Sequence, residues 1–261
     1  MDFAKSYAIA IKDVKEVFSS ASIYGPMLGV PLFFAILLPV LTFYVAIYAA
    51  PAIASRILPE AVITAASVSN PNSLKFMLFF TVNVLGPVFL TMPILTASVI
   101  AADSFAGEKE RKTSEALLST SITIPEMLLG KIMASLIPTI LLTVGVFALY
   151  GTITNALAFR AFGASLLPTV PWILMLLTSP FLAVATIGIV VLVSSHVRGI
   201  KEAQQISTLL VLPVLIMPFV SILGIADLTV AFFVYAIAAL ALIDVIIIYV
   251  GVKSFRKESI L

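Results

Sequence analysis

Residues 103–131 read DSFAGEKERKTSEALLSTSITIPEMLLGK and interrupt a chain that is otherwise mostly apolar. They hold five of the 13 acidic residues and four of the 15 basic residues. So many charges are too costly to place in the hydrocarbon core of a bilayer. The stretch therefore predicts a segment outside the lipid that meets water or a partner, between apolar runs that cross the membrane.

The composition is that of a membrane protein. Of the 261 residues, 61% are hydrophobic and 11% are charged, with a mean hydropathy of +1.19, whereas soluble proteins carry about 25% charged residues. At roughly 20 residues per span, this length allows about six helices and no soluble domain. We expect an all-α, polytopic membrane protein with one transmembrane domain over residues 1–261. The small net charge of +2 argues against a nucleic-acid partner, and the lack of cysteine excludes disulfides and thiol catalysis.

Six apolar runs are expected to be spans, at about 28–50, 76–101, 128–150, 171–194, 206–224 and 230–252. Residues 151–170 and 195–205 are expected to be loops. The fourth span begins with Pro-Trp172, a pair typical of the membrane interface. Pro213 and Pro218 leave open whether the fifth span is continuous or broken.

Residues 1–22 predict an amphipathic helix rather than a cleavable signal peptide, because charged residues interrupt the segment. Apolar side chains at helical spacing share one face: Phe3, Tyr7, Ala10, Ile11, Val14 and Phe18. Charged side chains fall opposite: Lys5, Lys12, Lys15 and Glu16. Such a helix is expected to lie in the interface plane with its lysines toward the headgroups. Packing against protein is the alternative, and Gly25 and Pro26 predict the bend into the first span.

The loop charges predict the orientation. The N-terminus, the central stretch, the 195–205 loop and the C-terminal tail together carry 12 Lys and Arg residues, and the other connections carry three. Basic residues accumulate on the cytoplasmic side. We therefore expect a multi-pass protein of the cell membrane with both termini and the central stretch in the cytoplasm.

The first half of the central stretch has helical charge spacing. Glu108 and Lys112, and likewise Arg111 and Glu115, are four residues apart and can pair on one helix face. Gly107 leaves open whether this helix continues from the second span.

The second half carries signals for a short helix and for a new span. Thr113 is suited to cap a helix that presents Leu117 and Leu118. Thr123 and Glu126 match a capping box that opens the third span. A short helix with an apolar tip and a charged rim predicts docking into a groove of another protein. The alternative is a solvated loop whose leucines pack on the membrane surface.

These residues resemble the ABC-2 membrane transporter family, the permease subunits of ATP-binding-cassette exporters. The family's E-x-E-R segment, T-x-E-x-L-L run and G-K pair have counterparts here: Glu108, Glu110 and Arg111; Thr113, Glu115, Leu117 and Leu118; Gly130 and Lys131. The segment SSHVRGIKEAQQ, over 194–205, also resembles the family's connection between spans four and five. Lys112 and Ser121 depart from the usual Gly and Pro, which puts the fit of the docking surface in question.

The resemblance implies the permease subunit of an exporter, with a short cytoplasmic coupling helix between spans two and three that docks in a separate ATPase subunit. The implied coupling residues are Glu108, Glu110, Arg111, Thr113, Glu115, Leu117 and Leu118. The chain has no phosphate-binding loop G-x-x-x-x-G-K-[ST], so it is expected not to be an enzyme. ATP and Mg²⁺ are expected in the partner ATPase, and a second permease protomer, expected to be an identical copy, would complete the path.

Polar residues within the spans support other readings. Asp244 lies in the sixth span, and intramembrane acids commonly serve as ion or proton sites. Asn83, in the second span, is expected mainly to hydrogen-bond a neighbouring helix. One alternative function is thus a secondary transporter driven by an ion gradient through Asp244, and another is a membrane anchor that recruits a cytoplasmic protein. His196 is the only histidine, so no metal site is expected.

Overall fold

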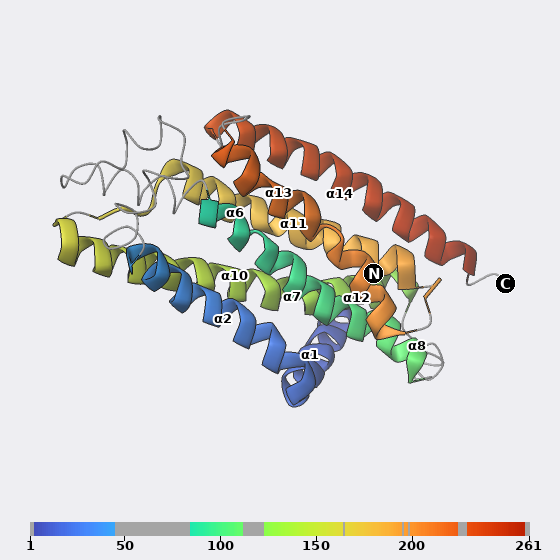
Figure 1. The fold of residues 1–261 in the computed structure, drawn as a ribbon. Helices are drawn as coiled ribbons and strands as arrows, with labels where there is room; N and C mark the ends of the chain where they lie inside the picture. Colours follow the sequence, from blue (N-terminus) through green and yellow to red (C-terminus); the bar gives the residue numbers. More distant parts are fainter. Residues whose placement is uncertain are drawn as a thin grey trace.

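The computed structural model describes residues 3–44, 84–111, 123–163, 165–194, 196–197, 199–223 and 229–258. Within these ranges, six helical segments are long and apolar enough to cross a membrane. Figure 1 shows the long helices side by side along one bundle axis, with α1 turning sharply away from α2 at one end. The expected all-α membrane protein with six spans is confirmed.

The helices follow one another as α1 (Phe3–Ser19), α2 (Ala21–Tyr44), α6 (Gly86–Phe89), α7 (Thr91–Ala102), η3 (Asp103–Gly107), α8 (Glu108–Glu110), α10 (Ile124–Phe162), α11 (Val170–Ser194), α12 (Ile200–Thr208), α13 (Val211–Ile222) and α14 (Val230–Glu258). Spans one, three, four and six correspond to α2, α10, α11 and α14. The second span combines α6, α7, η3 and α8, and the fifth combines α12 and α13.

The second span lies at the centre of the bundle, where α7 packs against α10, α11 and α12. Gly107 does not end this helix, which continues to Glu110 through the π-helical segment η3. A π turn holds more residues than an α turn and so changes the direction in which the following side chains point. Asp103, Ser104 and Glu108 are buried in the protein. The polar stretch was expected to meet water or a partner, and Ser104 and Glu108 meet polar partners on α1 and α10 of the same chain.

The third span, α10, extends well beyond the bilayer. Its 39 residues rise about 58 Å, against a hydrocarbon core of about 30 Å. The amide of Thr123 donates to the Glu126 carboxylate at 3.0 Å, which is the bond expected from a capping box. The expected loop over 151–170 is wrong for residues 151–162. Helix-compatible residues continue there until Gly163, whose φ of 68° is the left-handed conformation that ends a helix.

The fifth span is broken between α12 and α13. Pro213 has no N–H group, and its ring would clash with the carbonyl of Leu209 in a straight helix, which favours a kink or break at this point. The expected loop over 195–205 is wrong for residues 200–205, which form α12. Ser207 holds this helix against α7, because its hydroxyl lies 2.6 Å from the hydroxyl of Ser98. The polar composition of 200–205 hid a helix that is stabilised by packing.

An aromatic cluster fills the core between α6, α10 and α11. The ring of Trp172 lies 4.7 Å from that of Phe147 and 5.2 Å from that of Tyr150, measured between centroids. Phe89 packs against all three rings. Trp172 is buried within this cluster. As the only tryptophan of the chain, it is a natural fluorescence reporter of unfolding.

The N-terminal helix α1 packs along α10 through a face that the sequence did not single out. Its buried side chains are Ser6, Ile9, Ala10, Asp13 and Val17. Large apolar side chains of α1 point away from the bundle, with Phe3 71% and Tyr7 60% exposed. The break before α2 falls at Ser20, whereas Gly25 and Pro26 lie inside α2. The expected bend at Gly25 and Pro26 is thus wrong, since membrane helices tolerate both residue types.

Candidate functional site

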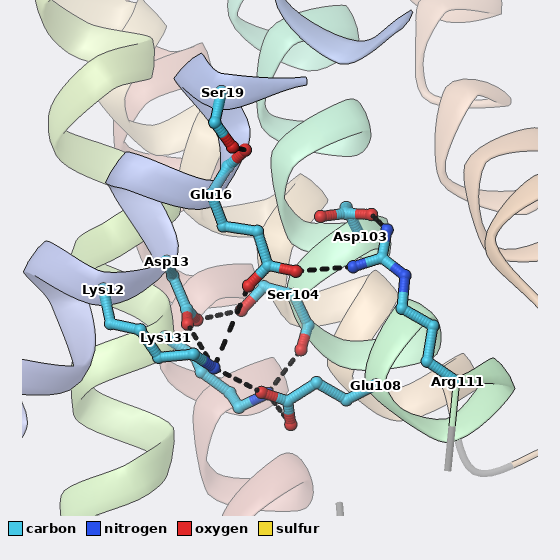
Figure 2. Close-up of polar contacts among 9 residues, drawn as sticks. All are labelled: Lys12, Asp13, Glu16, Ser19, Asp103, Ser104, Glu108, Arg111 and Lys131. Carbon is cyan, nitrogen blue, oxygen red and sulfur yellow. Dashed lines mark hydrogen bonds and ion pairs between the residues drawn. The ribbon is translucent and has the colours of Figure 1, made fainter. Parts of the chain in front are cut away.

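Four consecutive residues, 108–111, connect the second span to α1, α10, the end of α11 and the start of α12. They are the E-x-E-R segment of the sequence with its intervening lysine. We call the hub these four residues together with the side chains that complete the network: Lys12, Asp13, Glu16, Asp103, Ser104 and Lys131. Figure 2 shows α1 side chains meeting those of the second span and of α10 in this network.

Glu108 and Lys131 form the buried centre of the hub. Glu108 Oε2 lies 2.6 Å from Lys131 Nζ, and only 2% of the Lys131 side chain is exposed. Lys131 also donates to the backbone carbonyl of Ser104 and lies 5.1 Å from the ring centroid of Phe105. A buried charge is tolerated only when it is paired and hydrogen-bonded. This pair therefore ties the start of α10 to the end of the second span.

Arg111 connects the second span to α1 on the exposed side of the hub. One guanidinium nitrogen donates to Glu16 Oε1 at 2.6 Å, and the other donates to Asp103 Oδ1 at 2.7 Å. Arginine suits this position because its planar, forked donors reach two carboxylates at once. Arg111 thus bridges α1 and η3 across the surface of the network (Figure 2).

Two further contacts from α1 complete the network. Ser104 Oγ donates to Asp13 Oδ2 at 2.6 Å inside the protein. Lys12 Nζ lies 3.3 Å from both Asp13 Oδ1 and Glu108 Oε1. Burial lowers the pKa of Lys12, but the carboxylates of Asp13 and Glu108 outweigh burial, so the pKa is raised above its ordinary value. Lys12 therefore stays charged throughout the physiological range and keeps its ion pairs.

Lys109 and Glu110 hold the junction between α11 and α12. Lys109 Nζ donates to the carbonyls of Ser194 and Val197, at 3.4 and 3.3 Å, where α11 ends. Glu110 Oε2 accepts from the amide of Ile200 at 3.0 Å, where α12 begins. The C-terminus of a helix carries partial negative charge and the N-terminus partial positive charge. Two adjacent side chains of opposite charge thus match the two helix ends that meet here.

Two glycines make room for these contacts. A Cβ at Gly130 would lie 2.6 Å from the carbonyl oxygen of Ser6 and 2.8 Å from Cβ of Ile9, so glycine lets α1 approach the backbone of α10. A Cβ at Gly199 would lie 2.6 Å from Glu110 Oε2. In the G-K pair, Gly130 therefore lets α1 pack closely on α10, and the neighbouring Lys131 pairs with Glu108.

Gly199→Ala is expected to break the bond between Glu110 and the Ile200 amide while leaving the fold intact. The backbone at Gly199 is extended, which any residue adopts, so the added methyl group acts through Glu110 alone. Because Glu110 is exposed, we expect a loss of about 1 kcal/mol of unfolding free energy. Thermal unfolding followed by Trp172 fluorescence measures it. Glu110→Ala should cost a similar amount, and the double variant no more than either single change; additive losses would contradict the contact.

The structure brings together Glu108, Glu110 and Arg111 of the expected coupling residues. The expected positions Thr113, Glu115, Leu117 and Leu118 lie outside the described residues, as does Asn83. Asp244 is far from the hub in the sequence and sits on the buried side of α14, with 6% of its surface exposed. Its Oδ1 has no hydrogen-bond partner within the described part of the chain.

Sequence reasoning missed the contribution of α1 to this site. It assigned Lys12 and Glu16 to a face toward the headgroups and did not single out Asp13 or Ser104. One signal was available, because Ser6, Ala10, Asp13 and Val17 repeat at spacings of three and four and form a second face of α1. The small residues on that face fit the close approach at Gly130.

An open cavity of about 610 Å³ lies beside the hub. Its lining comes from Ser20, the second span and α12, and includes Asp103, Glu110, Arg111 and Lys201. The hub is therefore buried against α1 and α10 on one side and open on the other.

The family model described as ABC-2 family transporter protein matches residues 7–235, from α1 into α14, and so includes the whole hub. The chain belongs to the ABC-2 transporter family. Comparisons with curated proteins and with solved structures gave no match. Membership makes this ABC-2 chain a multi-pass membrane permease, and it implies partnership with an ATP-binding-cassette ATPase.

Proposed function

We propose that this ABC-2 permease is the membrane subunit of an ATP-driven exporter of the cell membrane. A separate ATPase subunit binds ATP and Mg²⁺, and a second copy of the permease completes the transport path. Both termini and the hub face the cytoplasm, in keeping with the 12 basic residues on that side against three on the other. The family match and the geometry of the hub support this function.

The observation that carries the proposal is the position of residues 108–111 in the chain. They directly precede residues 112–122, the segment proposed to dock in the ATPase, and each of the four binds a different part of the bundle. A force applied to the docking segment would thus act at once on α1, α10, α11 and α12. Glu108, Glu110 and Arg111 then distribute the force inside the permease, and Thr113, Glu115, Leu117 and Leu118 contact the ATPase.

Replacing Leu117 and Leu118 together with alanine tests the docking surface. Two truncated anchor residues should weaken ATPase binding roughly tenfold or more. The measurement is the amount of ATPase that co-purifies with the permease in mild detergent, with Ser119→Ala as the matched control. The helical circular dichroism of the double variant should stay unchanged. Full ATPase recovery and full ATP-driven transport in the double variant would refute this docking surface, and binding without transport in the wild type would favour the membrane anchor.

Asp244→Asn separates the proposed exporter from the ion-gradient alternative, which is kept because Asp244 is buried within a span. Asparagine preserves the shape of the side chain and removes its charge. We expect ATP-driven transport to persist in the variant, since the hub is unchanged. The measurement is transport in liposomes with and without the ATPase. Gradient-driven transport without the ATPase, lost in Asp244→Asn, would establish the secondary transporter instead.

A further inference from the structure

The helix α1 has three faces rather than two. The buried face packs on α10, and its Asp13 accepts a hydrogen bond from Ser104 of the second span. A second face presents the large apolar side chains Phe3, Tyr7, Ile11 and Phe18, all of them exposed. The third face carries Lys5, Lys12 and Lys15, by their helical spacing, and Lys12 reaches from it to Glu108. Packing within the protein accounts for the buried face, whereas the large apolar side chains of the second face are exposed in the described part of the chain.

The exposed apolar face of α1 is followed in the chain by an exposed apolar side of α2. α2 follows α1 after the single residue Ser20 and presents Val30, Phe33 and Ile36 on its exposed side. α2 is long and apolar enough to cross a membrane, so this exposed side suits contact with lipid chains. The apolar face of α1 thus lies beside the point where the first span enters the bilayer. Aromatic side chains with lysines beside them are typical of helices that lie in an anionic membrane interface.

Lys12 lies both in the hub and on the basic face of α1. Its ammonium group lies 3.3 Å from Glu108 Oε1 in the hub, and half of its side chain is exposed on the basic face of α1. A phosphate headgroup that approaches the lysines of α1 therefore meets the same cation that pairs with Glu108. Anionic headgroups and the hub share Lys12.

We propose that α1 binds anionic phospholipids of the inner leaflet and that their binding reaches the hub through Lys12. The apolar face inserts among the lipid chains near the headgroups, and the lysines hold the phosphates. A lipid headgroup that pairs with Lys12 leaves Glu108 paired with Lys131 alone. The ion pair between α1 and the second span is then weakened. The lipid contact stands on the geometry of α1, whereas its effect on coupling rests on the function proposed above.

The absence of cysteine in the chain permits site-specific spin labels on the full-length permease. Single cysteines at Tyr7 and Ile11 probe the apolar face, and single cysteines at Lys5 and Lys15 probe the basic face. In nanodiscs, labels on the apolar face should relax more with oxygen, and labels on the basic face more with a water-soluble nickel complex. Labels at Tyr7 and Ile11 that favour nickel would overturn the proposal. Labels at Tyr7 and Ile11 that become inaccessible to both oxygen and nickel only when the ATPase is bound would also overturn the proposal, because a protein would then cover this face.

A second experiment varies the anionic lipid content of the nanodiscs. Raising phosphatidylglycerol in phosphatidylcholine nanodiscs to about a third should move the Tyr7 label deeper. Each lysine of α1 replaced by glutamine should raise the phosphatidylglycerol content needed for half of this effect about fivefold. Lys201→Gln, an exposed lysine of α12, is the matched control and should change nothing. No response to phosphatidylglycerol would overturn the lipid specificity.

The link to the hub is read from ATP hydrolysis by the permease–ATPase complex. Phosphatidylglycerol should change the rate in the wild type and in Lys12→Arg, and should leave the rate unchanged in Lys12→Gln. A Lys12→Gln complex that still responds like the wild type would overturn the link. A wild-type chain that binds no ATPase would instead contradict the proposed function, and the spin-label result would remain interpretable on its own.

Discussion

Replacing Lys131 with methionine is expected to destabilise the permease by about 3 to 5 kcal/mol, because it leaves the buried Glu108 carboxylate without its closest cation. Lys12 remains 3.3 Å from the other carboxylate oxygen, which favours the lower end of this range. The backbone carbonyl of Ser104 also loses its buried donor. Thermal unfolding in detergent, followed by the fluorescence of the buried Trp172, measures the loss.

Two companion variants separate the charge pair from packing. Removing both charges, in Glu108→Leu with Lys131→Met, should recover much of the stability, since a buried pair exchanged for apolar groups is often neutral. The double variant should nevertheless lose ATP-driven transport, because α10 is no longer tied to the second span. A single Lys131→Met variant that unfolds at the wild-type temperature would show that the pair is not formed as described.

Gly130→Ala is expected to displace α1 from α10. The new methyl carbon would lie 2.6 Å from the Ser6 carbonyl oxygen, which is backbone and cannot rotate aside. Forcing an extra methyl group into such packing costs about 1 to 3 kcal/mol. Because Asp13, Glu16 and Lys12 enter the hub from α1, transport should fall with stability.

Gly145→Ala is the matched control on the same helix. A Cβ at Gly145 would meet nothing within 4 Å, and alanine favours helix by up to about 1 kcal/mol. The control should therefore be as stable as the wild type or slightly more so. Equal effects at the two glycines would mean that α1 does not press on Gly130. The effects of both substitutions are measured by the unfolding temperature and by the rate of proteolysis of α1.

The sequence predicted the parts of this molecule that depend on local chemistry. Glu126 caps the start of α10, and the E-x-E-R segment lies at the centre of the candidate site, because capping and motif spacing are written in neighbouring residues. The length of α10 was underestimated because residues 151–162 mix polar and apolar side chains. α12 was missed because its polar residues resemble those of a loop, and only packing against α7 selects the helix.

The partners of the hub were out of reach of local reasoning. Glu108 and Arg111 were expected to pair with residues four positions along the same helix. Those partners, Lys112 and Glu115, lie outside the described residues. The described contacts join Glu108 and Arg111 to Lys12, Glu16 and Lys131, on helices that are distant in the sequence. Such pairs depend on how α1 folds back onto α10, and a single sequence does not give that arrangement. Small residues at Gly130 and on the inner face of α1 were the available hint.

The central claim, that residues 108–111 carry the movement of the ATPase to the spans, is tested by one distance. Spin labels at Lys201→Cys on α12 and Tyr235→Cys on α14 report the position of α12 relative to a helix for which the described side chains show no contact with the hub. In the purified permease–ATPase complex, ATP with vanadate should shift this distance when the hub is intact. The shift should disappear in Lys109→Gln with Glu110→Gln, although the ATPase stays bound. An equal shift in that variant would contradict the account.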